Sequence, residues 1–174
     1  MSQQQLTSIT SFVVIAALLL ALPMAFAAAP SGHRAVQAHH AHRIDRSGRR
    51  QVGKASIYAR KFAGRRMADG HRMNPRDGNA ASKVLPLGTI AKVTNLKTGK
   101  STVVTIRDRG PYVRGRIVDL SPAAAASIGL ARKEGIARVE VVPIAVPMPD
   151  GSMKPGEGAQ EAVAQSQDAL AQSS

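Results

Sequence analysis

The side chains able to do chemistry between residues 53 and 144 are few. They are six carboxyls, one imidazole and hydroxyls that include Ser56, Ser82 and Tyr112. The carboxyls are Asp69, Asp77, Asp108, Asp119, Glu134 and Glu140, and the imidazole is His71. No metal-ligand spacing, phosphate-binding loop or Ser-x-Gly nucleophile elbow occurs, so metallohydrolase, nucleotide and esterase chemistries have no support. We expect neither a metal ion nor a cofactor.

Asp108 is the most informative of these carboxyls. It follows the alternating positions Thr102, Val104 and Ile106, so continued alternation places it on the core side at the end of a strand. A partly buried carboxyl can act as the general acid that glycosidic cleavage requires. Arg107 and Arg109 act in the opposite direction, because they stabilise the charged form. A salt-bridged turn carboxylate is therefore the competing interpretation.

The elements that must position these groups are mainly short strands. Alternating patterns over 101–106 and 137–141 predict half-buried strands, and residues 89–96 predict a third, joined to the first by a Gly-containing hairpin connection. One helix is predicted, with Ser121 as N-cap, Pro122 at its first position, an alanine run and Gly129 at its end. These signals predict a small β-barrel with one short helix.

The two ends of the chain differ in composition from this central domain. Residues 1–28 contain an apolar run with an Ala-x-Ala pattern, which predicts a secretory signal cleaved near Ala27 and Ala28; a retained membrane anchor is the alternative. Residues 29–52 predict a basic, disordered arm, in which His39, His40 and His42 form either an exposed linker or a metal-binding tract. Residues 145–174 predict a flexible tail rich in Pro, Ala, Gln and Ser.

Charge and cysteine content limit the partners. The chain has 24 Lys plus Arg against 11 Asp plus Glu, a net charge of +13, and no cysteine, which excludes disulfides, thiol chemistry and a lipid anchor on cysteine. Behind an export signal the charge favours an anionic wall polymer or membrane surface rather than nucleic acid. The competing interpretation is that the charge only keeps the domain soluble.

Eight blocks of residues resemble a known family. They are GKASIY from Gly53, ADG from Ala68, AASK from Ala80, LPLGT from Leu85, VTNL from Val93, RDRGPY from Arg107, GRIVDLS from Gly115 and AA from Ala124. In order and spacing they are similar to the rare lipoprotein A family across residues 53–144. The resemblance implies a six-stranded double-psi β-barrel related to expansins. It also implies an exported periplasmic or wall-associated lytic transglycosylase that forms 1,6-anhydroMurNAc, prefers glycan strands lacking stem peptides and serves daughter-cell separation with divisome partners.

Only some of the family's site residues are present at the matching positions of this sequence. Asp108 matches its catalytic aspartate, whereas His71 and Ser82 stand where the family commonly has Glu and His. Asp108 alone suffices for lytic cleavage, because one group can protonate the leaving oxygen and then accept the proton of the attacking 6-hydroxyl. The residues expected to bind substrate are His71, Ser82, Arg107, Arg109, Tyr112 and Arg116. Alternatively, His71 is a solvent-exposed loop residue, and the arginines, Arg114 included, only form a solvated basic face.

Three functions therefore remain open from sequence. The first is a lytic transglycosylase using Asp108. The second is an expansin-like peptidoglycan-binding module without catalysis, which the changed residues His71 and Ser82 favour. The third is a polyanion or nucleic-acid binder, which rests on charge alone and is opposed by the export signal.

Overall fold

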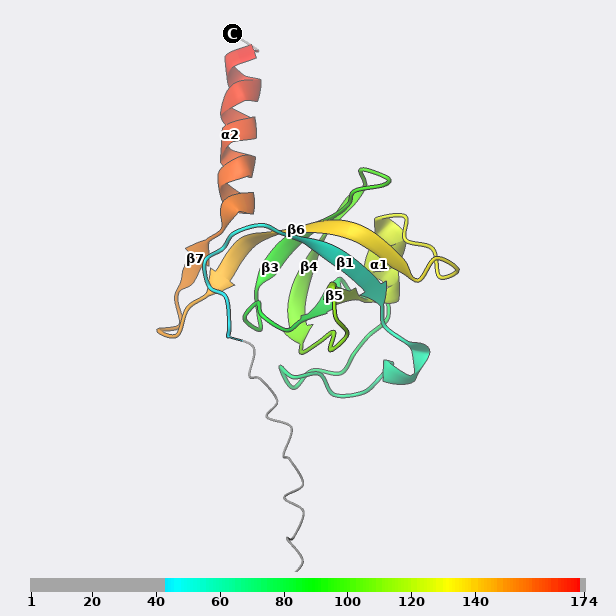
Figure 1. The fold of residues 1–174 in the computed structure, drawn as a ribbon. Helices are drawn as coiled ribbons and strands as arrows, with labels where there is room; N and C mark the ends of the chain where they lie inside the picture. Colours follow the sequence, from blue (N-terminus) through cyan, green and yellow to red (C-terminus); the bar gives the residue numbers. More distant parts are fainter. Residues whose placement is uncertain (1–42, 173–174) are drawn as a thin grey trace, which may run out of the picture. The chain divides into compact units, whose positions relative to one another are not determined.

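The computed structural model describes residues 43–172. The predicted signal segment and the tract of His39, His40 and His42 lie outside the described residues. The elements in chain order are β1 (Gln51–Ile57), the 3-10 turn η1 (Arg60–Phe62), β2 (Asn79–Ser82), β3 (Ile90–Asn95), β4 (Ser101–Asp108), β5 (Arg116–Leu120), α1 (Pro122–Ser127), β6 (Ile136–Pro147), β7 (Met153–Pro155) and α2 (Glu157–Gln172) (Figure 1). No helix in this part of the chain is long and apolar enough to span a membrane.

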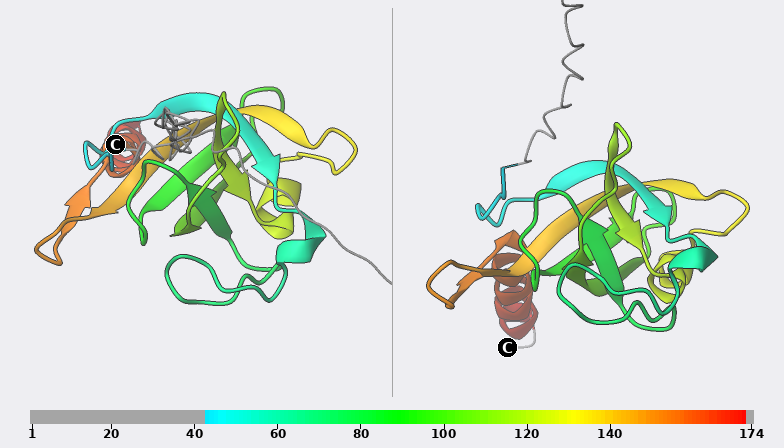
Figure 2. Two further views of the ribbon diagram at one scale, coloured as in Figure 1. Left: turned by 60° about the horizontal axis from the view of Figure 1, so that its bottom comes forward. Right: turned by 90° about the horizontal axis from the view of Figure 1, so that it is seen from below.

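Six strands form a closed, hydrogen-bonded ring. Their order is β1, β5, β2, β4, β3 and β6, and β6 pairs with β1 to complete the ring. The pairs β1–β5 and β2–β4 are parallel, and the other pairs are antiparallel. Figure 2 shows the strands wrapping around a common interior. The predicted six-stranded, mainly β barrel is confirmed, and two parallel pairs within a closed ring are the arrangement expected of a double-psi barrel.

The barrel interior is aliphatic, as a chain with 3% aromatic residues requires. Val104 and Ile106 of β4 are buried, as are Val139 and Val141 of β6, so the predicted alternation is confirmed in both strands. Residues of α1 close the same core. A second, smaller cluster lies apart from it and consists of Tyr58, Met67, Met73 and Ala81.

Helix α1 begins and ends at the predicted residues. The Ser121 hydroxyl accepts a hydrogen bond of 3.1 Å from the Ala124 N–H, which satisfies one of the free donors at a helix start. Pro122 follows as the first helical residue, and Gly129 has the positive φ of a helix end, at 72°. Ala124 and Ala125 pack into the barrel core.

The described parts of both flanking segments, residues 43–50 and 145–172, are more ordered than composition predicts. In the segment predicted to be a disordered arm, residues 43–50 contact the barrel, and the Asp45 N–H donates to the Val84 carbonyl at 2.7 Å. In the segment predicted to be a flexible tail, β6 continues to Pro147, β7 pairs with β6, and α2 follows. The physical reason is helix-favouring Ala, Glu and Gln together with a long-range charge contact that composition does not reveal.

That contact centres on Arg50. Its guanidinium pairs with Glu140 of β6 at 3.1 Å and with Glu157 of α2 at 3.0 Å, and it also pairs with Glu161. Gly156 completes the junction, because a Cβ there would lie 2.2 Å from the Pro143 carbonyl oxygen. The first turn of α2 is thus held between the arm and the barrel.

We expect Arg50→Ala to loosen the first turn of α2 while leaving the barrel intact, because exposed ion pairs act locally and weakly. Hydrogen exchange is the measurement: amides of residues 157–161 should exchange severalfold faster, and those of β3 and β4 should not change. Lys97→Ala is the control, since it removes a separate pair with Glu134. Equal protection of α2 in Arg50→Ala and Lys97→Ala would contradict this role of Arg50.

Candidate functional site

Asp108 ends β4, and its carboxylate accepts three hydrogen bonds. The Tyr58 hydroxyl donates to Oδ2 at 3.0 Å, and the N–H groups of Ala68 and Arg109 donate to Oδ1 at 3.0 and 2.8 Å. The donors come from the end of β1, from the long connection between β1 and β2, and from the turn after β4. The carboxylate is therefore fixed in orientation by three separate parts of the fold.

Asp108 does not continue the inward series of β4, which corrects the expectation from alternation. The register between β2 and β4 shifts between Ala80 and Ala81, so that Ala80 pairs with Ile106 but Ala81 pairs with Asp108. Ala80 belongs to the barrel core, whereas Ala81 belongs to the second cluster. A bulge adds one residue to a strand and changes the direction of the side chains after it. Asp108 accordingly faces the second cluster rather than the barrel interior.

Tyr58 links this second cluster to Asp108. Its side chain is only 7% exposed, and its ring meets Phe62 edge to face with 5.8 Å between centroids. Burial, and then the nearby charge of Asp108, raise the pKa of the Tyr58 hydroxyl far above its ordinary range. The hydroxyl is therefore protonated at any physiological pH and remains available to Asp108.

A second carboxyl, Asp119 of β5, lies on the same face. Ala81 pairs with Asp119 in the antiparallel β2–β5 ladder, so one alanine stands in register with both carboxyls. Two strand spacings place their Cα atoms about 10 Å apart. The Ser56 hydroxyl donates to Asp119 Oδ1. Gly110 lies above Asp119 with φ 130°, a conformation that favours glycine, and a Cβ there would be 3.8 Å from Asp119 Oδ2.

Asp69 ties the long β1–β2 connection to β4. Its Oδ2 pairs with Arg107 at 3.1 Å and with the His71 Nδ1 at 3.1 Å, and its N–H donates to the Arg107 carbonyl at 3.0 Å. Partial burial opposes ionisation of Asp69, but hydrogen bonds from the His71 N–H and from Arg107 outweigh it and lower the pKa. This anchoring places the adjacent Ala68 N–H where it reaches Asp108.

His71 and Ser82, two of the residues expected to bind substrate, differ in their exposure to solvent. The His71 side chain is 69% exposed, and its imidazole contacts Asp69 rather than Asp108. Ser82 is 1% exposed, and its hydroxyl accepts from the N–H groups of Val84 and Leu85 in its own turn. The structure thus gives the Ser82 side chain a local structural contact and does not bring it to Asp108.

The remaining predicted residues differ in burial and in their contacts. Arg107 is held by Asp69, and Arg109 Nη1 donates to the carbonyls of Ser82 and Leu85 at 3.1 and 2.6 Å. Burial lowers the pKa of Arg109. Tyr112 is 76% exposed. Arg116 is partly buried and has an Nε without a partner in the described part of the chain.

Sequence reasoning missed Tyr58, Asp119 and Ser56 as members of this site. All three lie within the blocks that carry the family resemblance, but no role follows for them from sequence. One signal was available for Tyr58, which is one of only two tyrosines in the sequence. The contact of Asp119 with Ser56 joins residues 63 positions apart, and nothing in the local sequence indicates it.

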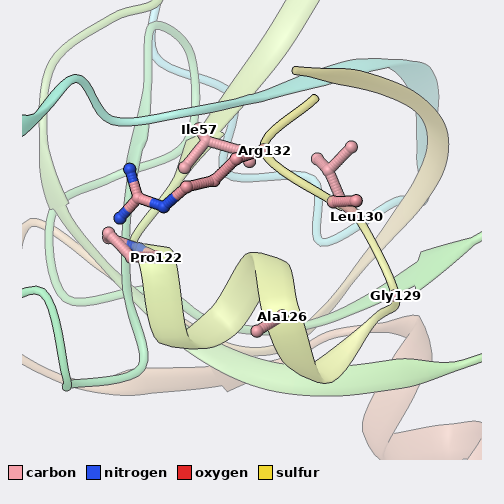
Figure 3. Close-up of a pocket in the computed structure, with 7 residues that line it drawn as sticks. Ile57, Pro122, Ala126, Gly129, Leu130 and Arg132 are labelled. Atoms are coloured by element: carbon pink, nitrogen blue, oxygen red, sulfur yellow. The ribbon is translucent and has the colours of Figure 1, made fainter. Parts of the chain in front are cut away.

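A hollow of about 300 Å³ lies elsewhere, between α1, the end of β1 and the turn after α1 (Figure 3). Its lining is apolar apart from Arg132, so it offers no group for acid-base chemistry. Over residues 43–172 no cluster of three or more His, Asp or Glu side chains is suited to a metal ion. The chemistry of the described chain is therefore concentrated around Asp108 and Asp119.

The barrel part of the chain is similar to known proteins. The family model described as lytic transglycolase matches residues 50–141. Among curated relatives, the probable endolytic peptidoglycan transglycosylase RlpA of Aquifex aeolicus is 51% identical over 80 residues, covering 46% of this chain and 35% of the relative. The endolytic peptidoglycan transglycosylase RlpA of Pasteurella multocida is 47% identical over 97 residues, covering 55% of this chain and 33% of the relative. The chain thus spans about a third of the length of these relatives.

Two solved structures also align with the chain. Streptomyces papain inhibitor gives a TM-score of 0.42 at 23% identity, covering 56% of this chain and 97% of the inhibitor. Apo Clavibacter michiganensis expansin gives a TM-score of 0.42 at 21% identity, covering 55% of this chain and 50% of the expansin.

The family model matches residues 50–141, which make up more than half of the 174-residue sequence. The chain therefore belongs to the rare lipoprotein A family of lytic transglycolase domains.

Proposed function

We propose that this chain is a peptidoglycan lytic transglycosylase that cleaves the MurNAc-GlcNAc bond and leaves a 1,6-anhydroMurNAc end. Family membership supports the reaction class. The observation that carries the proposal is the Asp108 carboxylate, fixed by Tyr58 and two backbone N–H groups beside a second carboxyl, Asp119.

The reaction needs one proton donor that later becomes an acceptor. Asp108 protonates the oxygen between MurNAc C1 and GlcNAc C4 as the C1–O bond breaks. The MurNAc 6-hydroxyl oxygen then bonds to C1, and its proton returns to Asp108, so no water is consumed. The three donors keep the carboxylate oriented between these steps and stabilise its charged form after the first. Asp119 adds negative charge on the same face, which favours the positive charge that develops at C1.

The surroundings of the site fit an anionic glycan. Residues 53–144 carry 18 basic and six acidic side chains, a charge of +12, and several of these arginines flank Asp108. Long-range attraction of this kind raises the rate of encounter with a polyanion. We further propose export to the periplasm or wall, a preference for strands lacking stem peptides, and a role in daughter-cell separation with divisome proteins.

A non-catalytic wall-binding module is the second candidate. The exposed position of His71 and the burial of Ser82 favour it, because neither side chain reaches Asp108 from the positions where the family commonly has Glu and His. Binding to peptidoglycan is common to both candidates. Only the products separate them.

The decisive experiment is mass spectrometry of soluble products after the protein is incubated with peptidoglycan, intact and stripped of stem peptides. We expect fragments ending in 1,6-anhydroMurNAc, and a loss of about 10²–10⁴-fold in rate for Asp108→Asn, since a general acid contributes that much. Asp150→Asn, in an exposed turn near β7, is the matched control. Binding to sacculi without any anhydro product would establish the second candidate instead.

Tyr58→Phe tests the orientation of Asp108. The phenyl ring keeps its packing, but Oδ2 loses its donor, and we expect kcat to fall about tenfold, the equivalent of one charge-assisted hydrogen bond. KM should change little, because Tyr58 is buried and does not reach the glycan. Ser127→Ala, which removes an exposed hydroxyl from α1 outside the expected substrate-binding residues, is the control. An unchanged kcat in Tyr58→Phe would refute the positioning role.

His71→Ala tests whether His71 replaces the family's Glu. Because the imidazole is exposed and contacts only Asp69 among nearby carboxyls, we expect the initial rate of product release to stay within about twofold. Lys61→Ala, on the same connection, controls for loss of a polar surface side chain. A tenfold or larger loss confined to His71→Ala would show instead that His71 takes part in the reaction.

A further inference from the structure

The segment before β1 brings an additional arginine, Arg46, to the neighbourhood of Arg109. The Asp45 N–H bonds to the Val84 carbonyl at 2.7 Å, within the connection between β2 and β3. Arg109 Nη1 is held by the carbonyls on either side of that point, those of Ser82 and Leu85. A single short turn therefore places both guanidinium-bearing residues.

The two guanidinium groups lack a neutralising partner. In the part of the chain that the structure describes, neither Arg46 nor Arg109 forms a salt bridge, and the buried Arg46 Nε has no hydrogen-bond acceptor. Asp45, the adjacent carboxyl, is occupied by Ser47 and Gln51. After burial, the charge of Arg46 is a further cause that lowers the pKa of Arg109, while Tyr112 and Asp108 act to raise it.

This arginine pair adjoins the reacting carboxyl. The Arg109 backbone N–H donates to Asp108 Oδ1 at 2.8 Å, and the guanidinium of Arg109 is anchored to the two carbonyls through Nη1. Guanidinium groups bind carboxylates through paired donors in a plane. The charges of Asp108 and Arg46 both act on the Arg109 guanidinium, so an anion that neutralises Arg46 and Arg109 would lie near the Asp108 carboxylate.

We propose that Arg46 and Arg109 form a subsite for the lactyl carboxylate of a muramoyl residue, with Arg46 as a specificity-determining residue supplied by the segment before the barrel. This inference rests on the proposed function. The lactyl group is a free carboxylate only where the stem peptide has been removed, because in a substituted residue the same carbon forms an amide. The pair therefore gains an ion pair with a stripped strand and none with a substituted one.

The test compares two forms of stripped glycan strands, one with free lactyl carboxylates and one in which they have been converted to neutral amides. Affinity is measured by sedimentation with the full chain carrying Asp108→Asn, so that strands are not cleaved. We expect roughly tenfold tighter binding to the free carboxylate form, and we expect Arg46→Gln to abolish most of that ratio. Arg49→Gln removes the same charge from an exposed neighbour and should leave the ratio unchanged.

The outcomes separate this inference from the proposed function. Equal affinity for the two glycans, or an unchanged ratio in Arg46→Gln, overturns the subsite even if anhydro products are formed. The subsite is supported if the preference for free carboxylate strands over amidated strands is lost in Arg46→Gln but kept in Arg49→Gln. This holds even if the protein with its native Asp108 binds peptidoglycan but releases no anhydro product. Binding of neither glycan overturns the subsite, and the proposed function is then decided by the anhydro products alone.

Discussion

The site depends on one strand, β2, being hydrogen-bonded to β4 on one side and to β5 on the other. That double pairing brings the ends of two strands, with Asp108 and Asp119, to either side of Ala81. The register shift at Ala80 and Ala81 then decides which face Asp108 occupies. Without the bulge, the carboxyl would enter an aliphatic interior that has no donors for it, at a substantial desolvation cost. Ring closure fixes these ladders in turn, because no strand of the barrel can slip without disturbing both neighbours.

The elements encoded by local pattern could be predicted from sequence. The alternation at Val104 and Ile106 and the Ser121 cap are properties of a few adjacent residues, and the structure contains both. Asp108 was identifiable as a candidate, but its direction was not, because the bulge depends on pairing with β2. Tyr58 lies 50 positions from Asp108 in sequence, so their bond follows only from the closed ring. The family resemblance supplied the double-psi type of barrel, because the local pattern alone predicted only a small β-barrel with one short helix.

Predictions were weakest where the type of a residue was used to infer where its side chain lies and what it contacts. A serine in place of a histidine suggested a smaller polar contact with the sugar, yet Ser82 is turned toward its own backbone. A basic composition without helical or strand periodicity suggested disorder before β1, yet residues 45–50 form specific bonds with Val84 and Glu157. In both cases the deciding partner is a backbone or side-chain group that composition does not reveal. Composition describes how an isolated segment would behave, whereas both of these segments are fixed by contacts within the folded domain.

The pairing of β1 with both β5 and β6 has a consequence for how the molecule forms. The strand that begins the barrel finds its partners only among residues 116–147, so ring closure must wait until nearly the whole domain exists. Non-local pairing of this kind slows folding, because a long loop loses entropy before any contact compensates for it. A chain interrupted within β5 or β6 has no barrel to form. The barrel therefore needs the whole domain, and a nascent chain that ends between β5 and β6 carries both carboxyls without the ring that holds them in place.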